Sequence, residues 1–117
     1  MRAFQISALV WMVGCAGVTS PQRACLDYAA VFAEVATNDC SRGTLEDNVV
    51  AFKDAARVGS ECELVTGIRD VVALEGECFS WMREEVRQNC GWLDDGSSFL
   101  ENFPEACRGQ LQVGTGP

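Results

Sequence analysis

The chain contains no histidine and only a single lysine among its 117 residues. Without histidine it lacks the usual general base, the Ser–His and Cys–His nucleophile pairs and the most common metal ligand. It also lacks a Cys-x-x-Cys pair, which excludes the spacing of a thioredoxin-like redox site or a zinc knuckle. No glycine-rich phosphate loop, Gly-x-Ser-x-Gly or His-Glu-x-x-His motif is present. We therefore expect a protein that is not an enzyme and that carries no metal or cofactor.

Acidic side chains are the remaining candidates for catalytic or metal-binding residues. Their placement is typical of solvent-exposed residues. Asp94 and Asp95 are adjacent, as are Glu84 and Glu85, whereas a hydrolase would need two acids that converge in a cleft. The Asp94-Asp95-Gly96 stretch is similar to part of a calcium loop, but the alternating ligands and the closing glutamate of such a loop are missing. We therefore assign these acids to turns and exposed helix faces.

Basic residues are scarce, and this sets the charge of the protein. Nine basic and 17 acidic residues give a net charge of −8, and every acid lies after position 26. Such a surface repels nucleic acids and anionic membranes, so we expect neither as a partner. The partner classes that remain open are an extracellular protein and a small ligand.

Long apolar runs are also missing, apart from one near the N-terminus. Residues 3–13 are mainly apolar, follow an arginine and precede small residues, as in a secretory signal peptide. The run is shorter than the about 20 residues of a membrane-spanning helix. We expect a signal peptide at residues 1–16 and a secreted mature chain without a transmembrane helix. The alternative is a lipid-anchored envelope protein, because residues 12–15 resemble the lipobox of bacterial lipoproteins, with Cys15 as the lipidated residue.

Six of the seven cysteines lie beyond the predicted signal peptide, and an even set in a short exported chain predicts a disulfide framework. We place the first helix upward, the second downward and the third upward again. Two cysteines then meet at each end of the bundle, and the last pair ties back the C-terminal segment. The predicted pairs are Cys25–Cys62, Cys40–Cys78 and Cys90–Cys107.

The apolar pattern after residue 23 is helical, and no stretch alternates for long enough to predict a strand. We predict an all-α fold, a small disulfide-stapled bundle of three main helices plus a short C-terminal helix. Thr44 followed by Asp47 is a capping box for the second helix. The expected helices are residues 24–36, 44–59, 60–90 and 98–103. The predicted domain organisation is a lead-in at 17–23, the six-cysteine helical domain at 24–108 and a flexible tail at 109–117.

The third predicted helix, residues 60–90, organises the chain. Ser60 and Glu63 form the pattern of a capping box at its start, and Gly91 suits a left-handed stop at its end. Apolar residues recur at every seventh position along it, which fits a helix and excludes a strand with its period of two. The members of this stripe are Val65, Val72, Phe79 and Val86.

Trp81 lies about 200° around the third helix from the apolar stripe. Such a large ring either covers the segment that carries Phe99 and Phe103 or is offered to a partner, because exposed tryptophans are enriched at binding hot spots. The predicted binding residues are Trp81, Trp92, Arg83 and Glu84. The sequence thus favours a secreted, non-catalytic protein that acts by binding, as an effector, a signal or a ligand-binding module.

Overall fold

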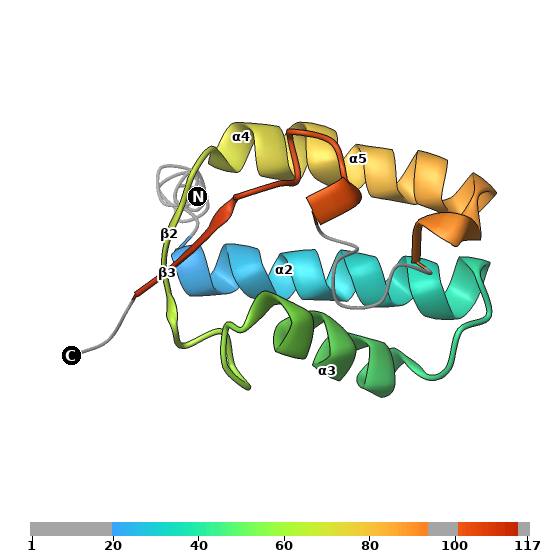
Figure 1. The fold of residues 1–117 in the computed structure, drawn as a ribbon, viewed down its shortest axis with the longest axis horizontal. Helices are drawn as coiled ribbons and strands as arrows, with labels where there is room; N and C mark the ends of the chain where they lie inside the picture. Colours follow the sequence, from blue (N-terminus) through green and yellow to red (C-terminus); the bar gives the residue numbers. More distant parts are fainter. Residues whose placement is uncertain (1–19, 94–100, 115–117) are drawn as a thin grey trace, which may run out of the picture.

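The computed structural model describes residues 20–93 and 101–114 of the chain. Helices, a two-stranded antiparallel sheet and three disulfides make up this part (Figure 1). The fold is therefore mostly helical and disulfide-rich, as predicted, but the sheet shows that it is not all-α. The predicted signal peptide, Cys15, the adjacent acids Asp94 and Asp95, and the start of the short fourth helix with Phe99 lie outside the described residues.

The first helix, α2 (Pro21–Glu34), begins inside the predicted lead-in. Ser20 caps it, because its Oγ accepts a hydrogen bond from the backbone nitrogen of Arg23 at 3.1 Å. Pro21 occupies the first turn, where its missing N–H has no helical partner in any case. α2 continues into the wider turns of η1 (Val35–Asp39), so the helical segment is longer at both ends than residues 24–36.

The second helix, α3 (Leu45–Ala56), runs antiparallel to α2 and packs against it (Figure 1). The predicted cap is confirmed, because Thr44 Oγ1 accepts a hydrogen bond from the backbone nitrogen of Asp47 at 3.1 Å. The helix ends earlier than predicted, at Ala56, because Arg57 takes a left-handed conformation with φ of 58°. Gly59 follows with φ of 93°, a conformation that residues with a side chain rarely adopt.

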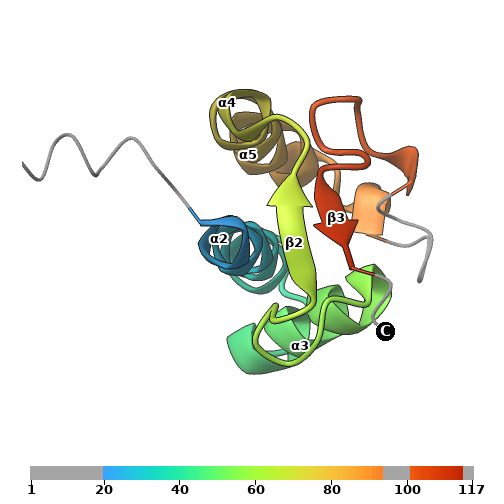
Figure 2. The same ribbon diagram turned by 90° about the vertical axis from the view of Figure 1, so that its left-hand side faces the viewer.

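Residues 60–70 do not join the long helix that the sequence predicts. They contain β2 (Val65–Ile68), which pairs antiparallel with β3 (Leu111–Val113) at one end of the molecule (Figure 2). Val65 lies opposite Val113, Ile68 lies opposite Leu111, and the register is irregular between Val65 and Gly67. β3 lies within the stretch that the sequence predicts as a flexible tail, so the ordered domain extends beyond residue 108.

Local geometry explains why no helix forms at residues 60–64. Cys62 has a left-handed φ of 58° and is bonded to Cys25, which fixes it in a non-helical conformation. Glu63 does not cap a helix with Ser60, because its carboxylate accepts a hydrogen bond from the backbone nitrogen of Glu61 at 2.8 Å. That hydrogen bond lowers the pKa of the Glu63 carboxyl. The capping pattern in the sequence therefore marks a tight turn here.

The third helix begins only after Asp70, whose Oδ1 accepts a hydrogen bond from the backbone nitrogen of Ala73 at 3.1 Å. Its pieces follow one another without a break, and the name "third helix" refers to all of them. They are α4 (Val71–Ala73), η2 (Leu74–Cys78), α5 (Phe79–Trp81) and η3 (Met82–Val86). η2 and η3 are π-type turns, in which the hydrogen bond spans five residues and the turn is wider than in an α-helix.

The buried face of the third helix matches the predicted stripe only in part, because Phe79 and Val86 are buried on it. Residues four apart line up along the inner face and are almost fully buried. They are Leu74, Cys78, Met82 and Val86. Val72, a member of the predicted stripe, is instead 80% exposed. Gly91 is not a left-handed stop, because it lies inside the 3₁₀ turn η4 (Cys90–Leu93) and has no positive φ.

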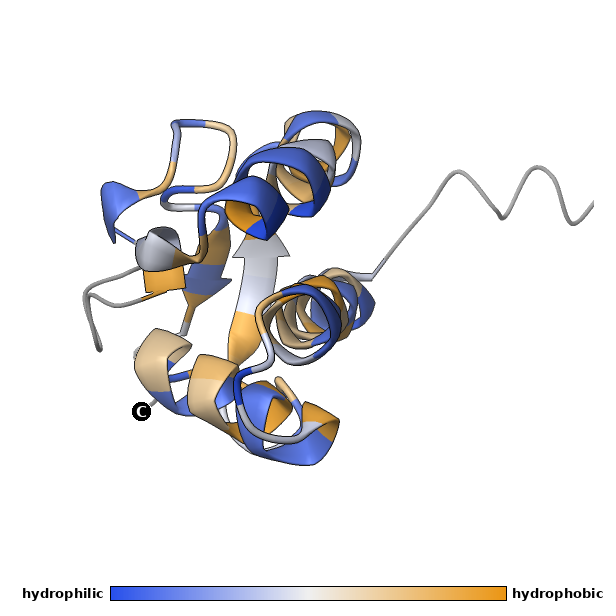
Figure 3. Cartoon of the chain, turned by 90° about the vertical axis from the view of Figure 1, so that its right-hand side faces the viewer, coloured by the Kyte–Doolittle hydropathy of each residue, from blue (hydrophilic) through white to orange (hydrophobic). Residues whose placement is uncertain are grey.

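Tyr28 of α2 is buried in the core, where its ring contacts α3 and the third helix. Its ring centroid lies 4.7 Å from that of Phe52 and 5.8 Å from that of Phe79. Hydrophilic residues dominate the outer sides of the helices (Figure 3). A second, smaller apolar cluster lies beside the sheet and is formed by Cys25, Val58, Cys62 and Val65.

The disulfide pattern agrees with the predicted one at a single pair. All six cysteines of the helical domain are bonded, but two of the predicted pairs, Cys40–Cys78 and Cys90–Cys107, are wrong. The observed pairs are Cys25–Cys62, Cys40–Cys90 and Cys78–Cys107.

The late start of the third helix accounts for the exchanged partners. The prediction counted the helix from residue 60, which would carry Cys78 along to the level of Cys40. Because the helix begins after Asp70, Cys78 lies only about two turns from its start. α2 and the third helix run in the same direction (Figure 1), so Cys90 reaches the end of the molecule where Cys40 lies.

Candidate functional site

The structure brings three aromatic rings together on one side of the third helix, and we call them the aromatic cluster. The ring centroid of Trp81 lies 5.0 Å from that of Trp92 and 4.9 Å from that of Phe103, both in edge-to-face arrangements. Phe103 is buried, with 1% of its surface exposed, whereas both tryptophans are partly exposed. Trp81 thus covers the segment that carries Phe103 and still offers part of its ring to solvent.

Two disulfides tether the segments that carry Trp92 and Phe103. Trp92 lies two residues after Cys90, which is bonded to Cys40 at the end of η1. Phe103 lies four residues before Cys107, which is bonded to the third helix. The rings come from distant parts of the chain, and these covalent links reduce the conformational freedom that a partner would otherwise have to remove on binding.

The other two predicted binding residues, Arg83 and Glu84, are exposed on the third helix. Arg83 lines a groove of about 350 Å³ between α2 and the third helix, and Trp81 is not among the residues of that groove. Glu84 is exposed, and no hydrogen bond or ion pair within the described ranges involves its side chain. The groove is acidic, because three carboxylates line it against the single guanidinium. These acids are Asp27, Glu34 and Glu75.

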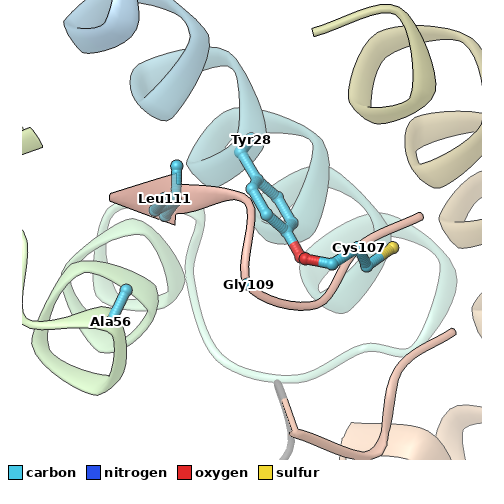
Figure 4. A pocket seen from close by; sticks show the side chains of 5 residues that line it. All are labelled: Tyr28, Ala56, Cys107, Gly109 and Leu111. Carbon is cyan, nitrogen blue, oxygen red and sulfur yellow. The ribbon is translucent and has the colours of Figure 1, made fainter. Parts of the chain in front are cut away.

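A separate cavity of about 120 Å³ lies where α2, α3 and the C-terminal segment meet (Figure 4). The Tyr28 hydroxyl donates a hydrogen bond to the backbone carbonyl of Cys107 at 3.2 Å. Burial raises the pKa of this hydroxyl well above the ordinary value of 10, so the group is neutral at physiological pH. The lining residues are Tyr28, Ala56, Cys107, Gly109 and Leu111.

Polar contacts fix the segment that forms one wall of this cavity. Gln110 is buried, with 1% of its surface exposed. Its Oε1 accepts a hydrogen bond from the backbone nitrogen of Asp70 at 2.8 Å. Its Nε2 donates one to the carbonyl of Ala106, also at 2.8 Å. One guanidinium nitrogen of Arg69 donates to the carbonyls of Glu105 and Arg108, at 2.7 and 3.0 Å. The C-terminal segment is therefore anchored to the turn before the third helix.

Sequence reasoning did not single out Tyr28 or the C-terminal wall of the cavity. One usable signal was the only tyrosine of the chain, placed on an apolar helix face, because a buried tyrosine hydroxyl usually requires a hydrogen-bond partner. Its partner, Cys107, lies 79 positions away, and no local pattern connects the two.

No known protein family, curated protein or solved structure matches this chain. Across residues 20–93 and 101–114, no three acidic or cysteine side chains gather closely enough to hold a metal ion. No helix in the same ranges is both long and apolar enough to cross a membrane. The three intramolecular disulfides fit a secreted or extracellular protein, because such bonds persist in oxidising compartments.

Proposed function

We propose that this chain is an exported protein that acts by binding a partner protein, with the aromatic cluster as its anchor. The observation that carries the proposal is the pair of partly exposed tryptophans, Trp81 and Trp92, held edge to face at 5.0 Å above the buried Phe103. Tryptophan is enriched among residues that dominate binding energy. Rings that are already fixed lose little freedom when a partner docks.

Export is supported by the cysteines as well as by the predicted signal peptide. The six cysteines after position 16 pair completely among themselves, which leaves Cys15 as the seventh. In a secreted protein an unpaired cysteine is expected to be removed, modified or bonded to another chain. Cleavage after Ala16 would remove Cys15 with the signal peptide.

The second candidate function is a lipid-anchored envelope protein, which the same unpaired Cys15 favours. In this case Cys15 would be lipidated and would become the first residue of the mature chain. Mass spectrometry of the mature N-terminus separates the two: a start near Gly17 supports free secretion, and an acylated Cys15 supports the anchor. A mature chain that retains residues 1–14 would contradict both.

Binding through the aromatic cluster is tested by affinity capture with three forms of the oxidised mature domain. The wild type, Trp92→Ala and Val72→Ala are immobilised and exposed to the extracellular fluid of the source organism. Val72 is the matched control, because it is an exposed apolar residue near the start of the third helix. We expect one protein to be retained by the wild type and by Val72→Ala but lost from Trp92→Ala. Equal retention by all three forms, or no specific retention, would contradict the proposal.

A further inference from the structure

The cavity beside Tyr28 has a buried floor and an open rim. Tyr28 and Cys107, which form the floor, are 1% and 3% exposed. Ala56 and Leu111 form walls that are partly exposed, and Gly109 at the rim is exposed (Figure 4). The open rim gives a small molecule a path from solvent into the cavity, and Tyr28 lies among the residues at its inner end.

The size of the cavity limits the ligand to a few heavy atoms. Apolar cavities of about 150 Å³ hold one benzene molecule, and this cavity measures about 120 Å³ and is open at its rim. Its walls cannot easily collapse to fill the space. Cys107 is bonded to Cys78, and Gln110 is hydrogen-bonded to Asp70 and Ala106, which fixes the segment on both sides of Gly109.

The lining of the cavity defines the chemistry of the ligand. None of its five lining residues carries a charge, so an ionised ligand inside the cavity would lose its hydration without a charged lining residue to compensate. The Tyr28 hydroxyl uses its proton in the hydrogen bond to Cys107. Its oxygen can still accept a hydrogen bond, and none of the described hydrogen bonds ends on it. A ligand that donates one hydrogen bond would satisfy this acceptor.

We propose that this cavity binds a small neutral molecule of about the size of a benzene ring that carries a single hydroxyl group. The apolar body of the molecule would contact Ala56 and Leu111, and its hydroxyl would donate a hydrogen bond to Tyr28 Oη. This site is separate from the aromatic cluster, because the cavity and the cluster share no residue. The proposal therefore does not depend on the protein partner proposed above.

The test measures the binding of phenol, benzene and benzoate to the oxidised domain by NMR titration. We expect phenol to shift the amide signals of Gly109 and Leu111 saturably and to bind about fivefold more tightly than benzene, the effect of one net hydrogen bond. Benzoate, which has a similar ring but a negative charge, should not bind there.

Two substitutions on α3 show whether the cavity itself is the site. Ala56→Leu fills it and should weaken phenol binding at least about tenfold, as expected when a ligand-sized space is occupied. Ala51→Leu adds the same volume at an exposed position of the same helix and should change nothing. If Ala56→Leu does not fold, Leu111→Ala provides the second arm, because it enlarges the cavity and should favour a para-substituted phenol over phenol.

Several results would overturn the proposal. They are the absence of saturable shifts at Gly109 and Leu111, equal phenol affinity of Ala56→Leu and Ala51→Leu, and equal affinity of the wild type for phenol and benzene. Shifts confined to the indole N–H signals of Trp81 and Trp92 would place phenol at the aromatic cluster and would also contradict it. Capture of a partner protein through Trp92 is measured separately, so failure of one proposal leaves the other standing.

Discussion

The Tyr28 hydroxyl and the Cys107 carbonyl are joined by a hydrogen bond of 3.2 Å although they lie 79 positions apart in the chain. The same Cys107 is bonded through sulfur to Cys78 in the third helix. One residue of the C-terminal segment therefore contacts both the first and the last long helix. The hydrogen bond from Tyr28 also removes the cost of burying an unpaired phenol hydroxyl in the core.

Tyr28→Phe should lower the free energy of unfolding by about 1–3 kcal/mol, because the buried Cys107 carbonyl would lose its donor. The aromatic ring remains, so its packing against Phe52 and Phe79 is retained. Denaturant unfolding of the oxidised domain measures the difference. An unchanged midpoint and slope would mean that water replaces the hydroxyl without cost.

Stability should also fall when the pH rises above about 10, the pKa of tyrosine in an unfolded chain. Burial raises the pKa of Tyr28 in the folded state, so above pH 10 the unfolded chain loses a proton that the folded chain keeps. The contribution of neutral Tyr28 to the free energy of unfolding is therefore fully present below pH 10. Above pH 10 the free energy of unfolding falls by up to about 1.4 kcal/mol per pH unit. Tyr28 is the only tyrosine, so ultraviolet titration reports on it alone. A Tyr28→Phe variant with the same alkaline slope would contradict this explanation.

Cys40–Cys90 should be the first disulfide to be reduced under mild conditions. Both of its residues are partly exposed, whereas none of the four other cysteines is more than 3% exposed. Thiolate attack requires access to sulfur. Loss of this link, which closes a loop of 50 residues, would cost about 4 kcal/mol in the chain-entropy model.

Partial reduction followed by alkylation and peptide mapping identifies which cysteines are released. The result expected is label on Cys40 and Cys90 while the other two pairs remain intact. Because Cys90 holds the turn that carries Trp92, tryptophan fluorescence should change at the same stage. Earlier labelling of Cys25 or Cys62 would contradict the order that exposure predicts.

The parts of the fold that depend on local chemistry could be predicted from the sequence. Thr44 and Asp47 form their cap within one turn, so the start of α3 follows from four residues. The same capping pattern at Ser60 and Glu63 failed, because the turn there is set by a disulfide to Cys25. Local patterns do not contain that constraint.

Features that depend on distant residues could not be predicted. β2 pairs with β3 across more than 40 positions, and the stretch that contains β3 has no strand-like alternation of its own. Of the predicted stripe, Phe79 and Val86 are buried, but Val72, which precedes the first π-type turn, is exposed. The placement of Cys78 and Cys90 depended on where the helix starts, so the error at residue 60 produced the error in pairing.

The candidate site was likewise predictable only where it depends on local sequence. Trp81 lies off the apolar face of one helix, and from that fact the sequence predicts either contact with the C-terminal segment or exposure to a partner. The structure shows the contact with Phe103. The groove that Arg83 lines, and the cavity beside Tyr28, depend on how helices pack. Spacing within the sequence does not determine that packing.

Trp81 and Trp92 should differ in what they contribute, although their rings are in contact. Trp81 lies between Trp92 and the buried Phe103, with centroids 5.0 and 4.9 Å away, whereas Trp92 lies farther from Phe103, at 6.4 Å. Truncation of a fully buried tryptophan costs about 3–5 kcal/mol. Because Trp81 is only partly buried, we expect Trp81→Ala to cost about 2–3 kcal/mol of unfolding free energy, and Trp92→Ala to cost less.

Thermal and denaturant unfolding of both variants measure the difference, with Trp81→Phe as the control. Phenylalanine at this position keeps an edge-to-face contact with Phe103, so it should recover most of the stability lost in Trp81→Ala. If binding to a partner falls in Trp92→Ala while its unfolding free energy is nearly unchanged, Trp92 is the binding residue and Trp81 its support. Equal losses of stability in the two alanine variants would instead show that both rings belong to the core, and the aromatic cluster would then not serve as a binding surface.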